Sequence, residues 1–254
     1  MLLLTPLIAI AYNIPTTPVP YQVDVHFNGY IPILGGMQGK VDLKVAITVK
    51  GLDPDNGNPR AKTDLADLKI ILNDAALPFG KDEVEKYFPN TVTMTPQGKV
   101  LKNDAPDLSL PVQLPGLDIK RFPDITFLPV EFPSEGIEVG KPFCYSRLFG
   151  ASAVNYTVTP SSISDTEVSL DLKMSQDFAN QEDDAHNVTK EPKDAVADVK
   201  THMQGTGKVL FDRHLGLVKS MHLDADSSTT VTDLKTKATS SRDLKTSEDV
   251  ALKS

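Results

Sequence analysis

The sequence predicts a mainly β protein, a curved antiparallel sheet or half-barrel with one or two short helices. Short stretches in which apolar and polar residues alternate recur along the chain, and a period of two is the signature of a half-buried strand. Several of these stretches end at glycine-containing turns, most clearly at residues 212–216. Compact helical patterns are scarce, and the clearest in the first half is a short one at residues 81–87, which Pro89 ends.

The first half of the chain contains four predicted strand regions. Alternation over residues 21–27, 41–49 and 68–72 predicts three strands, of which 41–49 is the most regular. Residues 53–59 are dense in Asp, Asn, Gly and Pro and predict a loop. Residues 91–102 predict a hairpin around Pro-Gln-Gly.

A proline-rich segment, residues 103–135, separates the two halves. It carries six prolines together with Leu, Ile and Phe. Because proline removes a donor from a strand ladder, we expect a crossing segment that lies against the protein. After it, residues 143–149, 154–159 and 168–174 predict strands. The acid-rich residues 175–200 predict a mobile loop with a short helix at 194–200.

The last hairpin, Thr201 to Ala225, divides into an apolar and a polar face. If Phe211 pairs with Leu217, the apolar face holds Met203, Val209, Phe211, Leu217, Met221, Leu223 and Ala225. The polar face then holds His202, Gln204, Thr206, His222, Asp224 and Asp226. One apolar and one polar face are typical of an antiparallel sheet that covers a core on one side.

The chain is expected to form two related lobes, because Met-Gln-Gly at residue 37 is echoed at residue 203. The predicted divisions are a signal peptide remnant at 1–11, an N-terminal β lobe at 12–102, the crossing segment at 103–135, a C-terminal β lobe at 136–237 and a disordered tail at 238–254.

Composition excludes several classes of partner. The net charge of −8 argues against nucleic acid, which is bound through Lys and Arg. Aromatic residues make up 6% and tryptophan is absent, which disfavours a base-stacking platform. Cys144 is the single cysteine, so no internal disulfide can form, and its neighbours Phe143 and Tyr145 predict a buried thiol.

The N-terminal residues 2–11 are apolar, and Ala9-Ile-Ala11 fits the small-x-small pattern of a signal peptidase site. This predicts export to a periplasmic or extracellular location. The alternative is a buried strand, because a positively charged start is missing. About ten apolar residues are too few to span a membrane as a helix.

Candidate catalytic and metal-binding patterns are weak. Residues 150–154 begin like a nucleophile elbow around Ser152 but lack the final glycine, and Gly205-Thr-Gly207 precedes a strand, not a helix. Asp53, Asp55 and Asp64 partly resemble a calcium loop, although a plain turn explains them better. His202, His222, Asp224 and Asp226 suit zinc by residue type, although a solvated strand face explains them better. We therefore predict no catalytic residue, no metal and no cofactor, and leave the ligand-binding residues unassigned.

Two segments carry a family resemblance. They are Phe132-Pro133 with Val139-Gly-Lys-Pro-Phe143, and the Gly205-x-Gly207…Phe211-Asp212…Gly216 hairpin. Over about residues 20–235 the chain resembles uncharacterised bacterial cell-envelope β-rich proteins, which are loosely similar to lipoprotein-carrier half-barrels. The resemblance implies a hydrophobic or lipid-like ligand on the apolar face of a curved sheet.

The function expected from the sequence is therefore that of an exported, non-enzymatic binding protein of the bacterial envelope. The alternative is a structural or interaction module that binds an envelope protein partner and no small molecule. Neither interpretation involves a membrane-spanning segment.

Overall fold

The computed structural model describes residues 7–31, 37–77, 89–105, 121–149, 152–186, 188–189 and 192–253. The predicted helix at 81–87 and part of the crossing segment lie outside these ranges. The elements, in chain order, are β1 (Val19–Ile31), β2 (Met37–Asp55), β3 (Asn58–Leu72), β4 (Ala75–Ala76), β5 (Asn90–Met94), β6 (Val100–Asn103), α3 (Phe122–Ile125), β7 (Phe143–Phe149), β8 (Ser152–Ile163), β9 (Glu167–Glu182), β10 (Val188–Thr189), the 3-10 helix η3 (Pro192–Asp194), β11 (Ala197–Asp212), β12 (Leu217–Asp233) and β13 (Thr239–Leu252).

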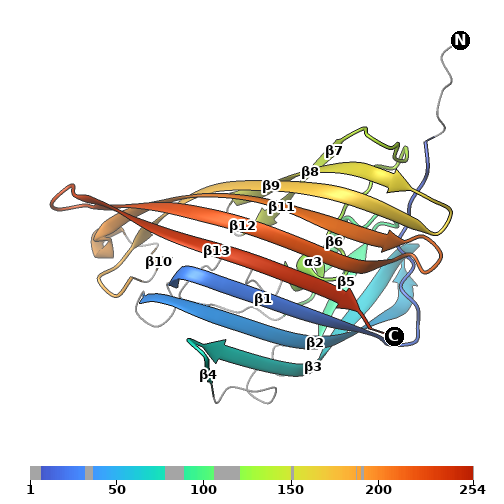
Figure 1. Cartoon of the computed structure of the whole chain (residues 1–254), viewed down its shortest axis with the longest axis horizontal. Helices are drawn as coiled ribbons and strands as arrows, with labels where there is room; N and C mark the ends of the chain where they lie inside the picture. Colours follow the sequence, from blue (N-terminus) through green and yellow to red (C-terminus); the bar gives the residue numbers. More distant parts are fainter. Residues whose placement is uncertain are drawn as a thin grey trace, which may run out of the picture.

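All the described strands belong to one curved antiparallel sheet (Figure 1). Its order is β6-β5-β3-β2-β1-β13-β12-β11-β9-β8-β7, with β4 beside β3 and β10 beside β9. The strands β6 and β7 stand at the two ends of this order, so the sheet is open. The predicted fold class is confirmed, and both predicted lobes contribute strands to this single sheet.

The first and last strands join the two halves of the sheet. β1 pairs with β13 from Tyr21–Leu252 to Gly29–Leu244. The predicted disordered tail at 238–254 is therefore wrong, because residues 239–252 form β13 between β1 and β12. The Ser and Thr residues of this segment lie at exposed or half-buried strand positions, where a small polar side chain suits a solvent-facing sheet surface.

The predicted mobile loop at 175–200 is also wrong for most of its length. β9 continues to Glu182 and β11 begins at Ala197. The short helix predicted at residues 194–200 is wrong, because a 3-10 turn at Pro192–Asp194 ends where that helix would begin and β11 starts at Ala197. The acidic residues misled the prediction because alternate positions on these long strands face solvent, whereas Gln176, Glu182 and Val199 are buried.

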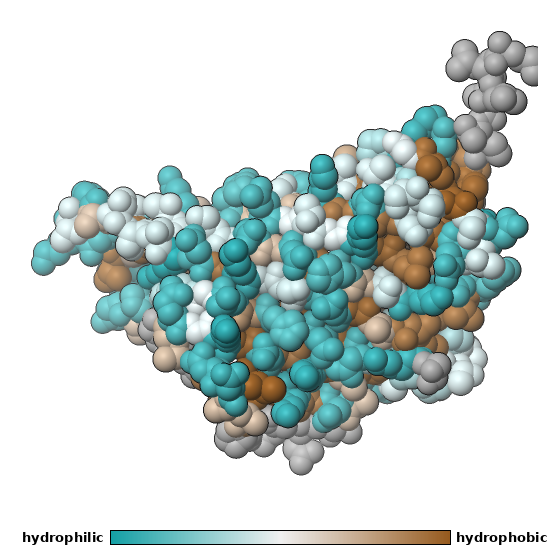
Figure 2. Space-filling model, in the orientation of Figure 1, coloured by the Kyte–Doolittle hydropathy of each residue, from teal (hydrophilic) through white to brown (hydrophobic). Residues whose placement is uncertain are grey.

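The core lies on one face of the sheet, which we call the inner face. It carries alternate residues of each strand, such as Val25 on β1, Leu43 on β2, Leu172 on β9, Met203 on β11 and Leu244 on β13. The opposite, outer face is polar, and Figure 2 shows mainly hydrophilic residues over the strands on this side. The predicted face partition of the last hairpin is confirmed from Met203 to Phe211 and from Met221 to Ala225. The assumed pairing of Phe211 with Leu217 is wrong, because a bulge pairs Phe211 with Val218 and Leu217 with Asp212.

The two predicted turns are confirmed by local geometry. Asn56 and Gly57 both have positive φ between β2 and β3, as a two-residue hairpin turn requires. The Asp212 carboxylate accepts hydrogen bonds from the backbone N–H groups of His214 and Leu215, and Gly216 has a φ of 67°. Of the residues considered for calcium, Asp53 and Asp55 lie at the end of β2 before this Asn-Gly turn, and Asp64 lies on β3, where it pairs with Lys62.

Candidate functional site

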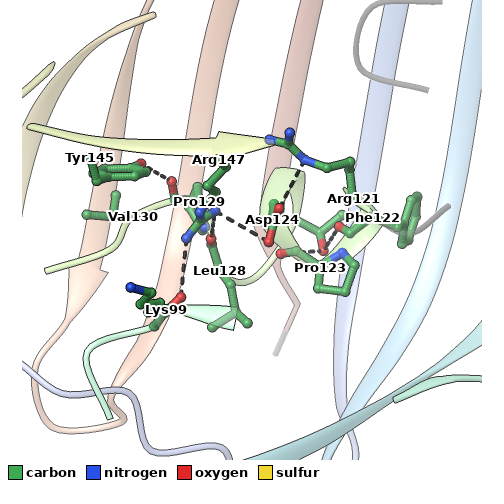
Figure 3. Close-up of polar contacts among 12 residues, drawn as sticks. Lys99, Arg121, Phe122, Pro123, Asp124, Leu128, Pro129, Val130, Tyr145 and Arg147 are labelled. Atoms are coloured by element: carbon green, nitrogen blue, oxygen red, sulfur yellow. Dashed lines mark hydrogen bonds and ion pairs between the residues drawn. The ribbon is translucent and has the colours of Figure 1, made fainter. Parts of the chain in front are cut away.

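A buried charge cluster fixes the crossing segment to one end of the inner face. Arg121 Nε lies 3.0 Å from Oδ2 of Asp124, and Arg147 Nη1 lies 3.5 Å from Oδ1 of the same carboxylate. All three side chains are nine-tenths buried or more. Figure 3 shows the two arginines reaching Asp124 from β7 and from the start of α3.

The guanidinium groups of this cluster also bind backbone carbonyl groups. Arg147 donates to Leu128 O and Gly98 O, and Arg121 donates to Leu148 O. These bonds connect the crossing segment, the β5–β6 turn and the edge strand β7. A buried charge is tolerated when it is paired and hydrogen-bonded in this way.

Aromatic side chains complete the attachment. The Tyr12 ring packs edge-on against Phe211 with centroids 5.2 Å apart, and its hydroxyl donates to Val130 O. Phe132 packs against Phe211 at 5.3 Å. The predicted contact of the crossing segment with the protein is thus confirmed for its described residues, where Phe127, Leu128, Val130 and Phe132 are buried.

The N-terminal residues also take part in this packing. Ile8 pairs with Ile137 through two backbone hydrogen bonds of 2.9 Å, and Ile10 is buried. These contacts place Ile8 and Ile10 against the rest of the protein, and the signal peptide remains a prediction.

The middle of the inner face is apolar but incompletely covered. Val41, Ile70, Met174 and Leu223 point to this face and are only half-buried. They come from β2, β3, β9 and β12, so the partly open apolar surface crosses both halves of the sheet. Apolar surface of this kind gives non-directional affinity for hydrophobic ligands.

On β9, β12 and β13, three buried side chains of this face have polar atoms without hydrogen-bond partners among the described residues. Both amide atoms of Gln176, the hydroxyl of Ser227 and Oε1 of Glu248 lack a partner, and these residues are 1%, 6% and 5% exposed. Leaving such a group unpaired is costly. Burial raises the pKa of Glu248 to about 8, with a smaller contribution from Asp249. Sequence reasoning missed all three, because alternation marks the face of a residue but not its partners.

The outer face carries cross-strand histidine–aspartate pairs. Nδ1 of His26, His202 and His222 lies 2.8, 2.8 and 2.7 Å from Asp42, Asp177 and Asp249, respectively. Each pair joins residues that stand directly opposite each other on neighbouring strands. The hydrogen bond to Asp249 raises the pKa of His222, whereas a hydrogen bond from Ser247 lowers the pKa of Asp224.

The residues considered for zinc do not form one cluster. His202 and His222 lie on the same face, but His222 stands opposite Lys208, six residues along β11 from His202. This spacing corresponds to about 20 Å along the strand. His222 binds Asp224 at 3.2 Å, whereas Asp226 lies 4.0 Å from Lys245. Among the described residues, no group of three or more His, Cys, Asp or Glu is placed to hold a metal.

One row on the outer face resembles a catalytic triad in residue type. Asp177, His202 and Ser228 stand opposite one another on β9, β11 and β12, beside an open depression of about 510 Å³. No hydrogen bond joins Ser228 to His202 among the described contacts. β12 is paired on both sides, so its ladders occupy the backbone N–H groups that an oxyanion hole would need. This row gives no support to a hydrolase.

The remaining candidates have structural explanations. Cys144 is exposed, so the predicted burial is wrong. On the edge strand β7 it points to the outer face near Thr157, whereas Tyr145 takes the inner position and stacks on Tyr156 at 4.8 Å. Gly205 and Gly207 lie inside β11, and Ser152 begins β8.

Comparisons with known proteins bear on the fold alone. No family model matches the chain, and no curated protein matches it. A solved structure described as lipid-protein interactions in lipovitellin is similar over 94% of this chain, with a TM-score of 0.51 and 12% identity. The chain spans about a quarter of the length of that lipovitellin chain. Among the described residues, no helix is long and apolar enough to cross a membrane.

The charge cluster predicts a large effect of a small substitution. Asp124→Asn keeps the shape but leaves Arg121 and Arg147 buried without a counter-charge. We expect the free energy of unfolding to fall by about 3 kcal/mol in chemical denaturation. The control Asp64→Asn breaks an exposed pair with Lys62 and should cost less than about 1 kcal/mol. Equal losses in both variants would contradict the assigned role.

Glu248 predicts a particular pH dependence of stability. Its pKa of about 8 in the folded protein lies above the ordinary value of 4.5, so the folded state binds more protons between these values and stability falls as pH rises through them. Glu248→Gln should remove this fall, which amounts to roughly 4 kcal/mol by pH 8. Denaturation from pH 4 to 9 measures it, with the exposed Glu135→Gln as control. A pH profile unchanged by Glu248→Gln would refute a buried, shifted carboxyl group.

Proposed function

We propose that this protein binds a hydrophobic, lipid-like ligand on the inner face of its sheet and acts without catalysis. The observation that carries the proposal is the set of half-buried apolar side chains, Val41, Ile70, Met174 and Leu223, across the middle of this face. The sheet does not close on itself over this face, and a hydrophobic ligand would cover the apolar surface that the described residues leave half-buried.

The attachment of the crossing segment supports the same function. Its contacts gather near Phe211, Tyr145 and Arg147, where charge pairs and aromatic rings hold it. Leu223 and Glu248 stand opposite each other on β12 and β13, in a different line of cross-strand neighbours on the inner face. The inner face thus combines a firmly packed end with a middle that keeps apolar surface available.

The shared fold with lipovitellin is consistent with this proposal, since that structure is described by its lipid–protein interactions. The similarity is one of fold, and the lipid role of this chain rests on its own inner face. Export and a place in the bacterial envelope remain predictions from the sequence.

The absence of tryptophan from the chain allows a direct test. Leu223→Trp places a single reporter on the inner face, and Thr206→Trp places one on the outer face of the neighbouring strand. Phosphatidylcholine brominated on its acyl chains, supplied from vesicles, quenches tryptophan only at close range. We expect quenching of the Leu223→Trp protein and little change in the Thr206→Trp protein.

The other outcomes have distinct meanings. Equal quenching of both reporters would indicate adsorption of the whole protein to vesicles and would contradict a specific inner-face site. No quenching of either reporter would favour the alternative, a structural module without a lipid ligand.

A further inference from the structure

Glu248 is a buried acidic residue on the inner face of the sheet. It points to the inner face from β13, is 5% exposed, and its Oε1 has no hydrogen-bond partner among the described residues. The carboxyl group therefore has unused hydrogen-bonding capacity inside an apolar surface.

The groups around Glu248 are apolar or face away. Val25 on β1 and Leu223 on β12 stand directly opposite it, and Thr246 and Val250 are its inner-face neighbours along β13. Asp249 lies on the outer face, where it binds His222. No charged side chain stands next to Glu248 on the inner face of these three strands, and Arg242, six residues away along β13, binds Glu182 instead.

An unpaired carboxyl group in such surroundings is stable in its neutral form, because burying a lone charge is far more costly. The pKa of about 8 is consistent with this. A neutral carboxyl group carries one O–H donor, which an acceptor oxygen can satisfy. Leu223 beside it is half-buried, so a ligand on the apolar surface can approach this donor.

We propose that Glu248 is the hydrogen-bonding contact for an uncharged lipid ester that lies against Leu223 and Val25. Its O–H would donate to an ester carbonyl oxygen of the ligand. This inference rests on the proposed function and adds a ligand class to it. A fatty acid anion would place a second acid beside Glu248, and a cationic amphipath would create a buried ion pair whose desolvation offsets its attraction.

The test uses two probes that differ only in the ester carbonyl. They are a pyrene-labelled diacylglycerol and the dialkyl ether of the same chain lengths, titrated into the full chain at pH 7. The wild-type protein should bind the ester about tenfold more tightly than the ether, the size expected for one buried hydrogen bond. Glu248→Leu should abolish this preference, and Glu248→Gln should retain it because an amide also donates.

Two controls separate this contact from a general effect on the fold. Ser227→Ala removes another unpartnered polar group on the same face, four residues or about 13 Å further along β12, and should leave the preference unchanged. Raising the pH from 7 to 9.5 should weaken ester binding to the wild-type protein, as Glu248 ionises, but not to the Glu248→Gln protein.

The outcomes distinguish this inference from the function on which it rests. Equal binding of ester and ether to the wild-type protein, or a preference that survives Glu248→Leu, would overturn the role of Glu248 and leave lipid binding intact. Tighter binding of a pyrene-labelled alkylammonium or of the free fatty acid would overturn the ligand class. Binding of none of these probes would overturn the proposed function itself.

Discussion

The pairing of β1 with β13 is the constraint on which the rest of the structure depends. It joins strands from the two ends of the described chain along nine residue pairs, and it makes one sheet of two halves that would otherwise each have an exposed edge. It also places Val25 opposite Glu248, so the inner face continues across the junction. Because the cross-strand neighbours of Glu248 come from both halves, the proposed ligand surface exists only when the junction is formed.

The inner face holds two kinds of buried polar group, and they have different roles. Asp124 offsets part of the charge of Arg121 and Arg147, and both arginines donate to backbone carbonyl groups, so the cluster holds the crossing segment in place. Glu248 has no such compensation and lowers the stability of the ligand-free fold. A fold that is marginally stable overall retains such a penalty most readily when the group acts in binding.

Much of the fold could be predicted from the sequence, because alternation reports directly on which side of a strand is buried. The faces of the last hairpin were predicted correctly, with His202 and His222 exposed and Met203 and Met221 buried. The extensions of β9 and β11 were not predicted, because charged residues occupy their solvent-facing positions. β13 was not predicted, because its many Ser and Thr residues weaken the alternation of apolar and polar residues. The charge cluster and Glu248 could not be found from the sequence, since Arg147 reaches Asp124 from a separate strand and an oxygen of Glu248 is distinguished by the lack of a partner.

The central claim is that the inner face holds a lipid-like ligand, and native mass spectrometry of the full chain purified without detergent tests it most directly. The protein mass should be accompanied by a discrete adduct in the mass range of a lipid, which organic extraction removes. The extracted material should identify the ligand class. A bare protein mass before extraction, repeated after incubation with phospholipid vesicles, would contradict the claim and favour a structural module.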